Sequence, residues 1–66
     1  MNKVDAMYYQ TTAQSFFDGS IPFDDKNPHH LLIREKVELG IEADFYSRRF
    51  VSVFMQWICN SESNNR

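Results

Sequence analysis

A chain of 66 residues forms one domain at most and lies near the lower size limit for independent folding. Hydrophobic residues make up 42% of it, which excludes a disordered chain, and the single cysteine excludes an internal disulfide. The net charge of −2 disfavours a dedicated nucleic-acid binder, because phosphate contacts call for a basic excess.

The start of the chain, residues 1–5, is polar and has no signal-peptide core. No apolar run reaches the roughly 18 residues that a membrane span requires. We therefore expect a cytoplasmic protein that does not enter the membrane.

The spacing of apolar residues predicts a first helix over about residues 3–18. Its apolar face comprises Ala6, Tyr9, Ala13, Phe16 and Phe17. Asn2 is a favoured N-cap residue. Gly19 is expected to end the helix in the left-handed conformation.

Residues 19–27 form the predicted connection, in which Pro22 prevents the helix from continuing. Ile21 and Phe23 are apolar, and we expect them to fold back over the end of the hairpin. Asn27 and Pro28 then give a strong start signal, a cap residue followed by a proline that fits the first helical turn.

A long second helix is predicted over about residues 28–59. A broad apolar stripe runs along it, comprising Leu32, Leu39, Ala43, Tyr46, Phe50, Val53, Phe54 and Trp57. A second row, Val37, Ile41 and Phe45, lies on roughly the opposite side. Gly40 either permits a close helix crossing or breaks the segment into two helices.

Two further points concern the end of the chain. Residues 50–58 are rich in β-branched and aromatic residues, which leaves a strand as the alternative to a helix. They show no clean alternation and have no partner strand, so we prefer the helix. Residues 60–66 contain no apolar residue and are predicted to be a disordered tail.

These elements together predict an all-α fold, a two-helix hairpin over residues 1–59. Ordering the chain costs on the order of 100 kcal/mol of conformational entropy, which one small core barely offsets. We therefore expect a homodimer, a four-helix bundle, although the sequence leaves open which apolar stripe forms its interface. The expected core is Tyr9, Phe16, Phe17, Tyr46, Phe50, Phe54 and Trp57.

Nothing in the sequence indicates catalysis, a cofactor or a metal. His29 and His30 are adjacent and point about 100° apart on a helix, so they cannot chelate one ion as an i, i+4 pair does. Cys59 has no neighbouring base, and we expect it to pack at the end of the apolar face. A non-enzymatic protein is therefore expected.

The second row is the candidate partner-binding site. The alternative is that this row packs on the first helix while the broad stripe forms the dimer. Val37, Ile41 and Phe45 are flanked by Arg48 and Arg49, and apolar patches rimmed by charge are typical of protein interfaces. We expect a regulatory protein that self-associates and binds a partner protein. The alternative is a nucleic-acid-associated regulator, of DNA or the ribosome, that uses Arg34, Arg48 and Arg49.

The order and spacing of the residues at the helix boundaries resemble those of the ribosome modulation factor family of small helical-hairpin proteins. The shared features are a helix ending at Gly19, the pair Asn27-Pro28, Arg34, and the pair Leu39-Gly40. The resemblance implies a two-helix hairpin. Glu38 stands where that family has a tryptophan, and this chain lacks the family's basic excess. The general profile is also similar to small early-region accessory proteins of lambda-like temperate phages, which implies a factor that modulates host or phage development.

Overall fold

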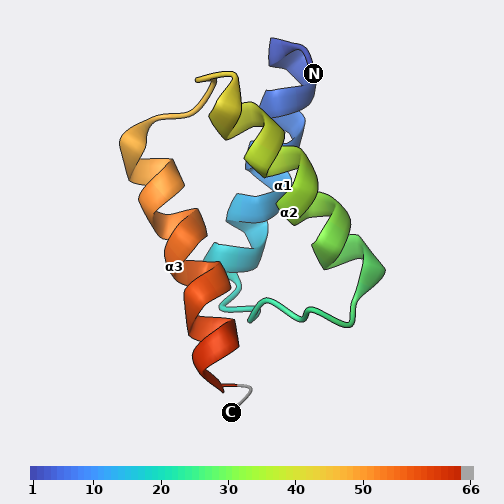
Figure 1. The fold of residues 1–66 in the computed structure, drawn as a ribbon, viewed down its shortest axis with the longest axis vertical. Helices are drawn as coiled ribbons and strands as arrows, with labels where there is room; N and C mark the ends of the chain where they lie inside the picture. Colours follow the sequence, from blue (N-terminus) through green and yellow to red (C-terminus); the bar gives the residue numbers. More distant parts are fainter. Residues whose placement is uncertain (65–66) are drawn as a thin grey trace.

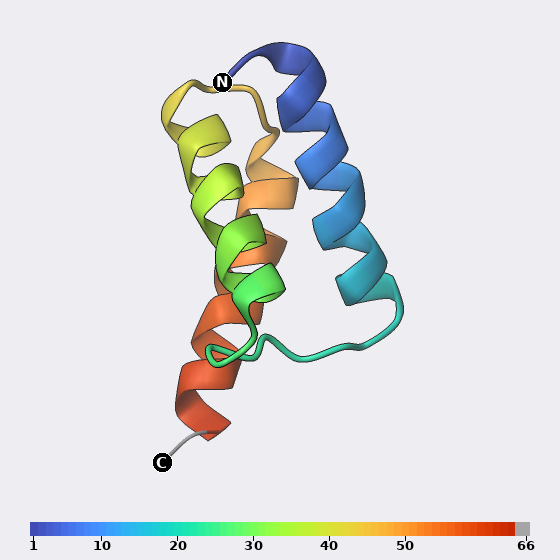
Figure 2. The ribbon, with the colours of Figure 1, turned by 90° about the vertical axis from the view of Figure 1, so that its right-hand side faces the viewer.

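A computed structural model shows three helices: α1 (Lys3–Asp18), α2 (Pro28–Glu42) and α3 (Arg48–Asn64). It describes the backbone of residues 1–64 and the side chains up to residue 60, and that part of the chain contains no strand. The fold is therefore all-α, as predicted, and the strand alternative for residues 50–58 is wrong. The views in Figures 1 and 2 agree that α1 and α3 run in the same direction and that α2 runs opposite to both.

The starts of the first two helices are as predicted. The Asn2 side chain accepts a hydrogen bond from the backbone N–H of Asp5 at 2.8 Å and caps α1. The Asn27 side chain accepts from the N–H of His29 at 2.9 Å, and Pro28 occupies the first position of α2. Each cap satisfies a backbone donor that has no partner within its helix, so local chemistry fixes both starts.

The ends of the same helices use residues other than the glycines. Ser20 follows α1 with a φ of 55°, and Asp44 follows α2 with a φ of 60°, so both take the left-handed conformation. Gly19 has an ordinary φ of −84°, so the expectation that it would be the left-handed residue is wrong.

Both ends are Schellman motifs. After α1, the N–H of Ser20 donates to Phe17 and that of Ile21 donates to Phe16; after α2, the N–H groups of Asp44 and Phe45 repeat the pattern on the carbonyls of Ile41 and Gly40.

The predicted single helix over residues 28–59 is in fact two helices, so the chain is not a two-helix hairpin. The break lies at residues 43–47, after Gly40, which stays within α2. The Ser47 hydroxyl accepts from the N–H of Phe50 at 3.2 Å and caps the start of α3. The disordered tail is also wrong for residues 60–64, which belong to α3. Residues 65–66 lie outside the described part.

The break decides which apolar row faces the core. On one continuous helix, Leu32 and Leu39 would share a face with the core residues of α3. In the structure they are 42% and 41% exposed, while Val37 from the opposite row is fully buried. The five residues from 43 to 47 reset the phase between the helices, so α2 packs with one predicted row and α3 with the other.

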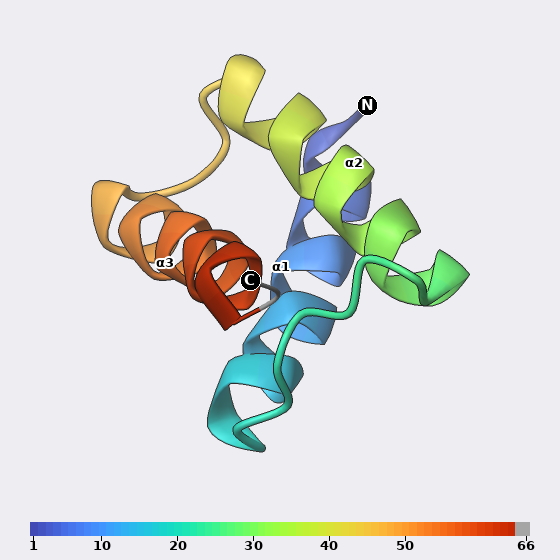
Figure 3. The same cartoon turned by 60° about the horizontal axis from the view of Figure 1, so that its bottom comes forward.

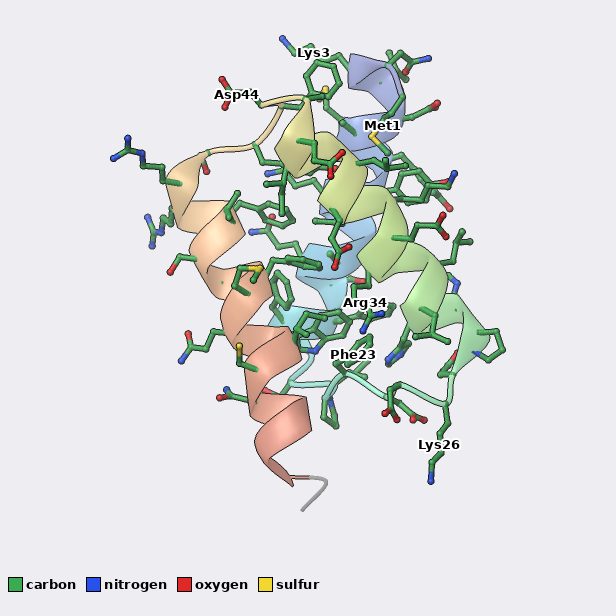
Figure 4. The ribbon with its side chains drawn as sticks, viewed as in Figure 1. Met1, Lys3, Phe23, Lys26, Arg34 and Asp44 are labelled. Atoms are coloured by element: carbon green, nitrogen blue, oxygen red, sulfur yellow. The ribbon has the colours of Figure 1, made fainter. Side chains whose placement is uncertain are left out.

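The predicted aromatic core is present. Tyr46, Phe50, Phe54 and Trp57 are buried, and Tyr9, Phe16 and Phe17 are partly buried against them. α2 and α3 diverge in Figure 1, and Figure 4 shows large side chains in the space between their ribbons. Ala6 and Ala13 are buried on α1, where small side chains permit close approach of the helices.

The Tyr46 side chain contacts both α1 and α2. The Tyr46 hydroxyl, just before α3, donates a buried hydrogen bond of 2.8 Å to the backbone carbonyl of Ala6 on α1. The Tyr46 ring lies directly against Gly40 of α2, where a Cβ atom would come within 2.7 Å of the ring carbon Cζ. Gly40 therefore leaves room for the Tyr46 ring of the α2–α3 connection. This is a close approach of a side chain and not the helix crossing predicted for this glycine.

The connection from α1 to α2 is fixed by the burial of one of its side chains and by hydrogen bonds to α2 and α3. Phe23 is 4% exposed, as expected for a residue that covers the hairpin, whereas Ile21 is 43% exposed. The Trp57 indole N–H donates to the carbonyl of Ile21 at 2.8 Å. His30, which is also buried, accepts from the N–H of Asp24 through Nδ1 at 3.0 Å.

Candidate partner-binding groove

A groove of about 480 Å³ lies between α1 and α3. Gln10, Gln14, Phe17 and Asp18 line it from α1; Ser47, Arg49, Phe50 and Val53 line it from the α3 side. The aromatic rings of Phe17 and Phe50 meet at its base, with centroids 6.1 Å apart. We call this feature the α1–α3 groove.

Helical spacing places the polar and apolar residues on separate parts of the groove. Gln10 and Gln14 are four residues apart, so their amides follow one another along the α1 wall. Arg49 and Val53 have the same spacing on α3. The floor is apolar, and the walls carry groups that donate and accept hydrogen bonds, which is the usual composition of a small binding site.

The two charged residues lie at opposite ends of the groove. Arg49 is in the first turn of α3, whereas Asp18 is the last residue of α1, and the two helices run in the same direction. Helix dipoles favour acidic residues at N-termini and basic residues at C-termini. Both residues contradict that preference. The groove is therefore positive at the end near the start of α3, which is the upper end in Figure 1, and negative at the end near the C-terminus of α1, which is the lower end.

A second depression, of about 270 Å³, lies at the lower end of the fold, where the α1–α2 connection meets α3. Its lining is mostly apolar and includes Ile21, Pro22 and Trp57. Figure 3 shows the connection running from the end of α1 across the front of that helix to the start of α2. No charged side chain among residues 1–60 lines this depression, so these residues offer fewer groups for specific recognition.

The five residues predicted as a partner-binding patch do not lie together on one surface. Val37 is fully buried in the core, so it is not an accessible anchor, and Ile41 is partly buried against the same core. Phe45 is 37% exposed in the α2–α3 connection. Arg48 and Arg49 are both exposed on α3, but only Arg49 lines the α1–α3 groove.

The third arginine predicted for nucleic-acid contact is already engaged. Arg34 lies 3.8 Å from the Glu38 carboxylate, and its guanidinium sits over the Phe23 ring at 5.5 Å from the centroid. Figure 4 shows Arg34 beside Phe23 below α2. In the part of the chain that the structure describes, neither Arg48 nor Arg49 forms an ion pair.

Sequence reasoning missed the α1 wall of the groove. Gln10, Gln14 and Asp18 lie among weak helix formers, and no motif distinguishes them. The α3 wall could have been predicted from the sequence, because Ser47 followed by an apolar run is an N-cap signal. Recognising that signal would have placed Arg49 in a first helical turn.

Other chemistry-bearing residues form no site. Among the side chains that the structure describes, residues 1–60, no group of three His, Cys, Asp or Glu residues could hold a metal ion. Cys59 is exposed, so the expectation that it packs against the apolar face is wrong. His30 is surrounded by the rings of Phe16, Phe23 and Trp57, and is a core residue. None of the described helices has the length and apolar character that would let it cross a membrane.

Three comparisons, with protein-family models, with curated proteins and with solved structures, each found no match to this chain. The functional conclusion therefore depends on the geometry of the chain itself.

Proposed function

We propose that this protein is a small non-enzymatic regulatory protein that acts by binding a partner protein in the α1–α3 groove. The observation that supports this most is the combination of an apolar floor with a charged residue at each end. Interface centres are enriched in aromatic side chains and arginine, and both are present here. A role as an accessory factor of a phage or mobile element is compatible with such a protein and remains part of the proposal.

The experiment is site-specific photo-crosslinking in a bacterial lysate. A photoreactive residue at Gln14 reports on the groove, and one at Glu35, exposed on α2, is the matched control. We expect a discrete protein adduct from position 14 and none from position 35. Equal labelling at both positions, or no adduct at either, would contradict partner binding in the groove.

Self-association is the second part of the proposal, and the exposed outer face of α1 supports it. Val4, Met7 and Tyr8 are 75%, 58% and 63% exposed, and their spacing places them along one side of the helix. We propose a homodimer through this face, because a chain this small gains much of its stability from association. The interface of a predicted four-helix bundle is replaced in this proposal by one between three-helix units.

Light scattering after size-exclusion chromatography tests this dimer. We expect the wild type to be a dimer, Tyr8→Asp to be a folded monomer, and Phe45→Asp to remain a dimer. A monomeric wild type at all accessible concentrations would exclude self-association but would leave the groove proposal untouched.

Nucleic-acid binding is a second candidate function, because Arg48 and Arg49 are exposed and unpaired among the described residues. Salt separates the two classes. Binding that weakens steeply as salt rises indicates phosphate contacts, whereas an apolar interface tolerates salt. The acidic balance of the chain favours the protein partner.

A further inference from the structure

The geometry points to one kind of partner segment for the α1–α3 groove: an amphipathic helix that runs antiparallel to α1 and α3. It would carry an acidic residue near its C-terminal end and a basic residue near its N-terminal end. This inference rests on the proposed partner-binding function and specifies the form and the polarity of the partner.

The charges of the groove set the direction of the helix. Arg49 lies at the upper end, next to the positive N-terminus of α3, and Asp18 lies at the lower end, at the negative C-terminus of α1. A helix with its C-terminus at the upper end places its own negative dipole end beside Arg49. Its positive N-terminus then lies beside Asp18. The opposite direction would bring like charges together at both ends.

Both charges also contradict the preference of the helix that carries them. Arg49 opposes the dipole of α3, and Asp18 opposes that of α1. Places where a local rule is broken without an internal compensation are characteristic of functional sites. Among the described residues neither charge forms an ion pair. Opposite charges on a bound partner would explain why both residues are present.

The lining of the groove specifies the rest of the partner helix. Phe17, Phe50 and Val53 present an apolar floor, which calls for apolar side chains at i, i+3 and i+4 spacing. The α1 wall from Gln10 to Asp18 comprises nine residues, and the eight steps between its ends correspond to about 12 Å, or roughly two helical turns. A helix seated there would pack beside α1 on the side away from α2 and complete a four-helix arrangement.

The test uses two designed alanine-based helical peptides of about four turns, ~14 residues each. Both contain the same leucines and the same charges. One carries lysine near its N-terminus and glutamate near its C-terminus, and the other has these charges exchanged. The first peptide is the poorer helix by itself, because its charges oppose its own dipole. A preference for it therefore cannot come from helicity.

The readout is the chemical shift of each backbone amide of the ¹⁵N-labelled full chain during titration with each peptide. We expect shifts at Gln10, Gln14 and Val53, and about tenfold tighter binding of the first peptide, roughly the value of one good charge pair. The double variant Asp18→Lys with Arg49→Glu should invert the preference. Arg48→Glu is the matched control, because Arg48 is exposed in the same turn but does not line the groove.

Three results would overturn the inference: equal affinities, a preference that the double variant does not invert, or no shift in the groove at millimolar peptide. Groove amides that shift with protein concentration alone would assign the groove to a second copy and would also overturn it. Crosslinks from position 14 together with equal affinities or an uninverted preference would remove only the helix polarity and leave partner binding in place.

Discussion

Gly40→Ala gives a sharp test of the packing of the Tyr46 ring against α2, because helix propensity and packing predict opposite signs. Alanine is preferred over glycine in a helix interior by about 1 kcal/mol. A methyl group at this position would meet the Tyr46 ring, at 2.7 Å from Cζ and 2.8 Å from the hydroxyl oxygen. These distances are well inside van der Waals contact, so Tyr46 must move.

The size of the effect follows from what Tyr46 loses. Overpacking a filled core costs about 1–3 kcal/mol. Displacing the ring also breaks its buried hydrogen bond to the Ala6 carbonyl, which costs about 1 kcal/mol more. After the propensity gain, we expect a net loss of about 1–3 kcal/mol. In a domain of this size each kcal/mol lowers Tm by about 4–8 °C.

Thermal and urea unfolding followed by far-UV circular dichroism measures this loss. The matched control repeats the substitution in a Tyr46→Leu background, where the shorter side chain leaves room for the methyl group. There Gly40→Ala should be neutral or stabilising. A higher Tm for Gly40→Ala in the wild-type background would refute the close contact between Gly40 and Tyr46.

Three other predictions address caps, pH and the core. Ser20→Gly and Asp44→Gly should each stabilise the protein by about 1 kcal/mol, since both residues are left-handed and glycine adopts that conformation freely; a lower Tm in both would contradict the Schellman motifs. Burial raises the pKa of the Tyr46 phenol above its ordinary value. The folded chain therefore keeps this proton where the unfolded chain has lost it, so stability is complete below about pH 10 and falls as pH rises through the folded pKa. Tyr46→Phe should flatten that alkaline decline in urea titrations, and an unchanged decline would exclude Tyr46 as its source. Phe54→Asp should abolish cooperative unfolding, because Phe54 is fully buried and an unpaired charge would replace it; a cooperative melt at the wild-type temperature would disprove this core position.

The helix starts could be predicted because their signals are local and chemically specific. Asn2 and the pair Asn27-Pro28 satisfy orphan N–H groups or dispense with one, and few other residues do this as well. The helix ends were harder to predict from the sequence. Glycine is the usual left-handed residue at such ends, yet this chain uses Ser20 and Asp44.

One misplaced helix end changed the interpretation of the whole surface. Treating residues 28–59 as one helix joined Leu39 and Phe50 on one face and set Val37 apart as a candidate anchor. The five-residue break at 43–47 rotates α3 relative to α2, and Val37 becomes core. Hydrophobic periodicity specifies faces only within one continuous helix, so it could not reveal this rotation.

The groove could not be predicted because its two walls belong to helices that are distant in sequence. Gln14 and Arg49 become neighbours of one groove only through the packing of α1 against α3. The sequence did mark Arg49 as a candidate binding residue. The α1 residues that line the same groove could be identified only from the three-dimensional structure.

The measurement that tests this account most directly is thiol accessibility at two positions of α2. Val37→Cys and Leu39→Cys are compared in a Cys59→Ser background, with labelling by a maleimide in the folded state. The three-helix fold predicts that position 37, fully buried, resists labelling, while position 39, where leucine is 41% exposed, reacts readily. Rapid labelling at position 37 with protection at position 39 would show that α2 packs with its other face, and would contradict both the fold and the groove derived from it.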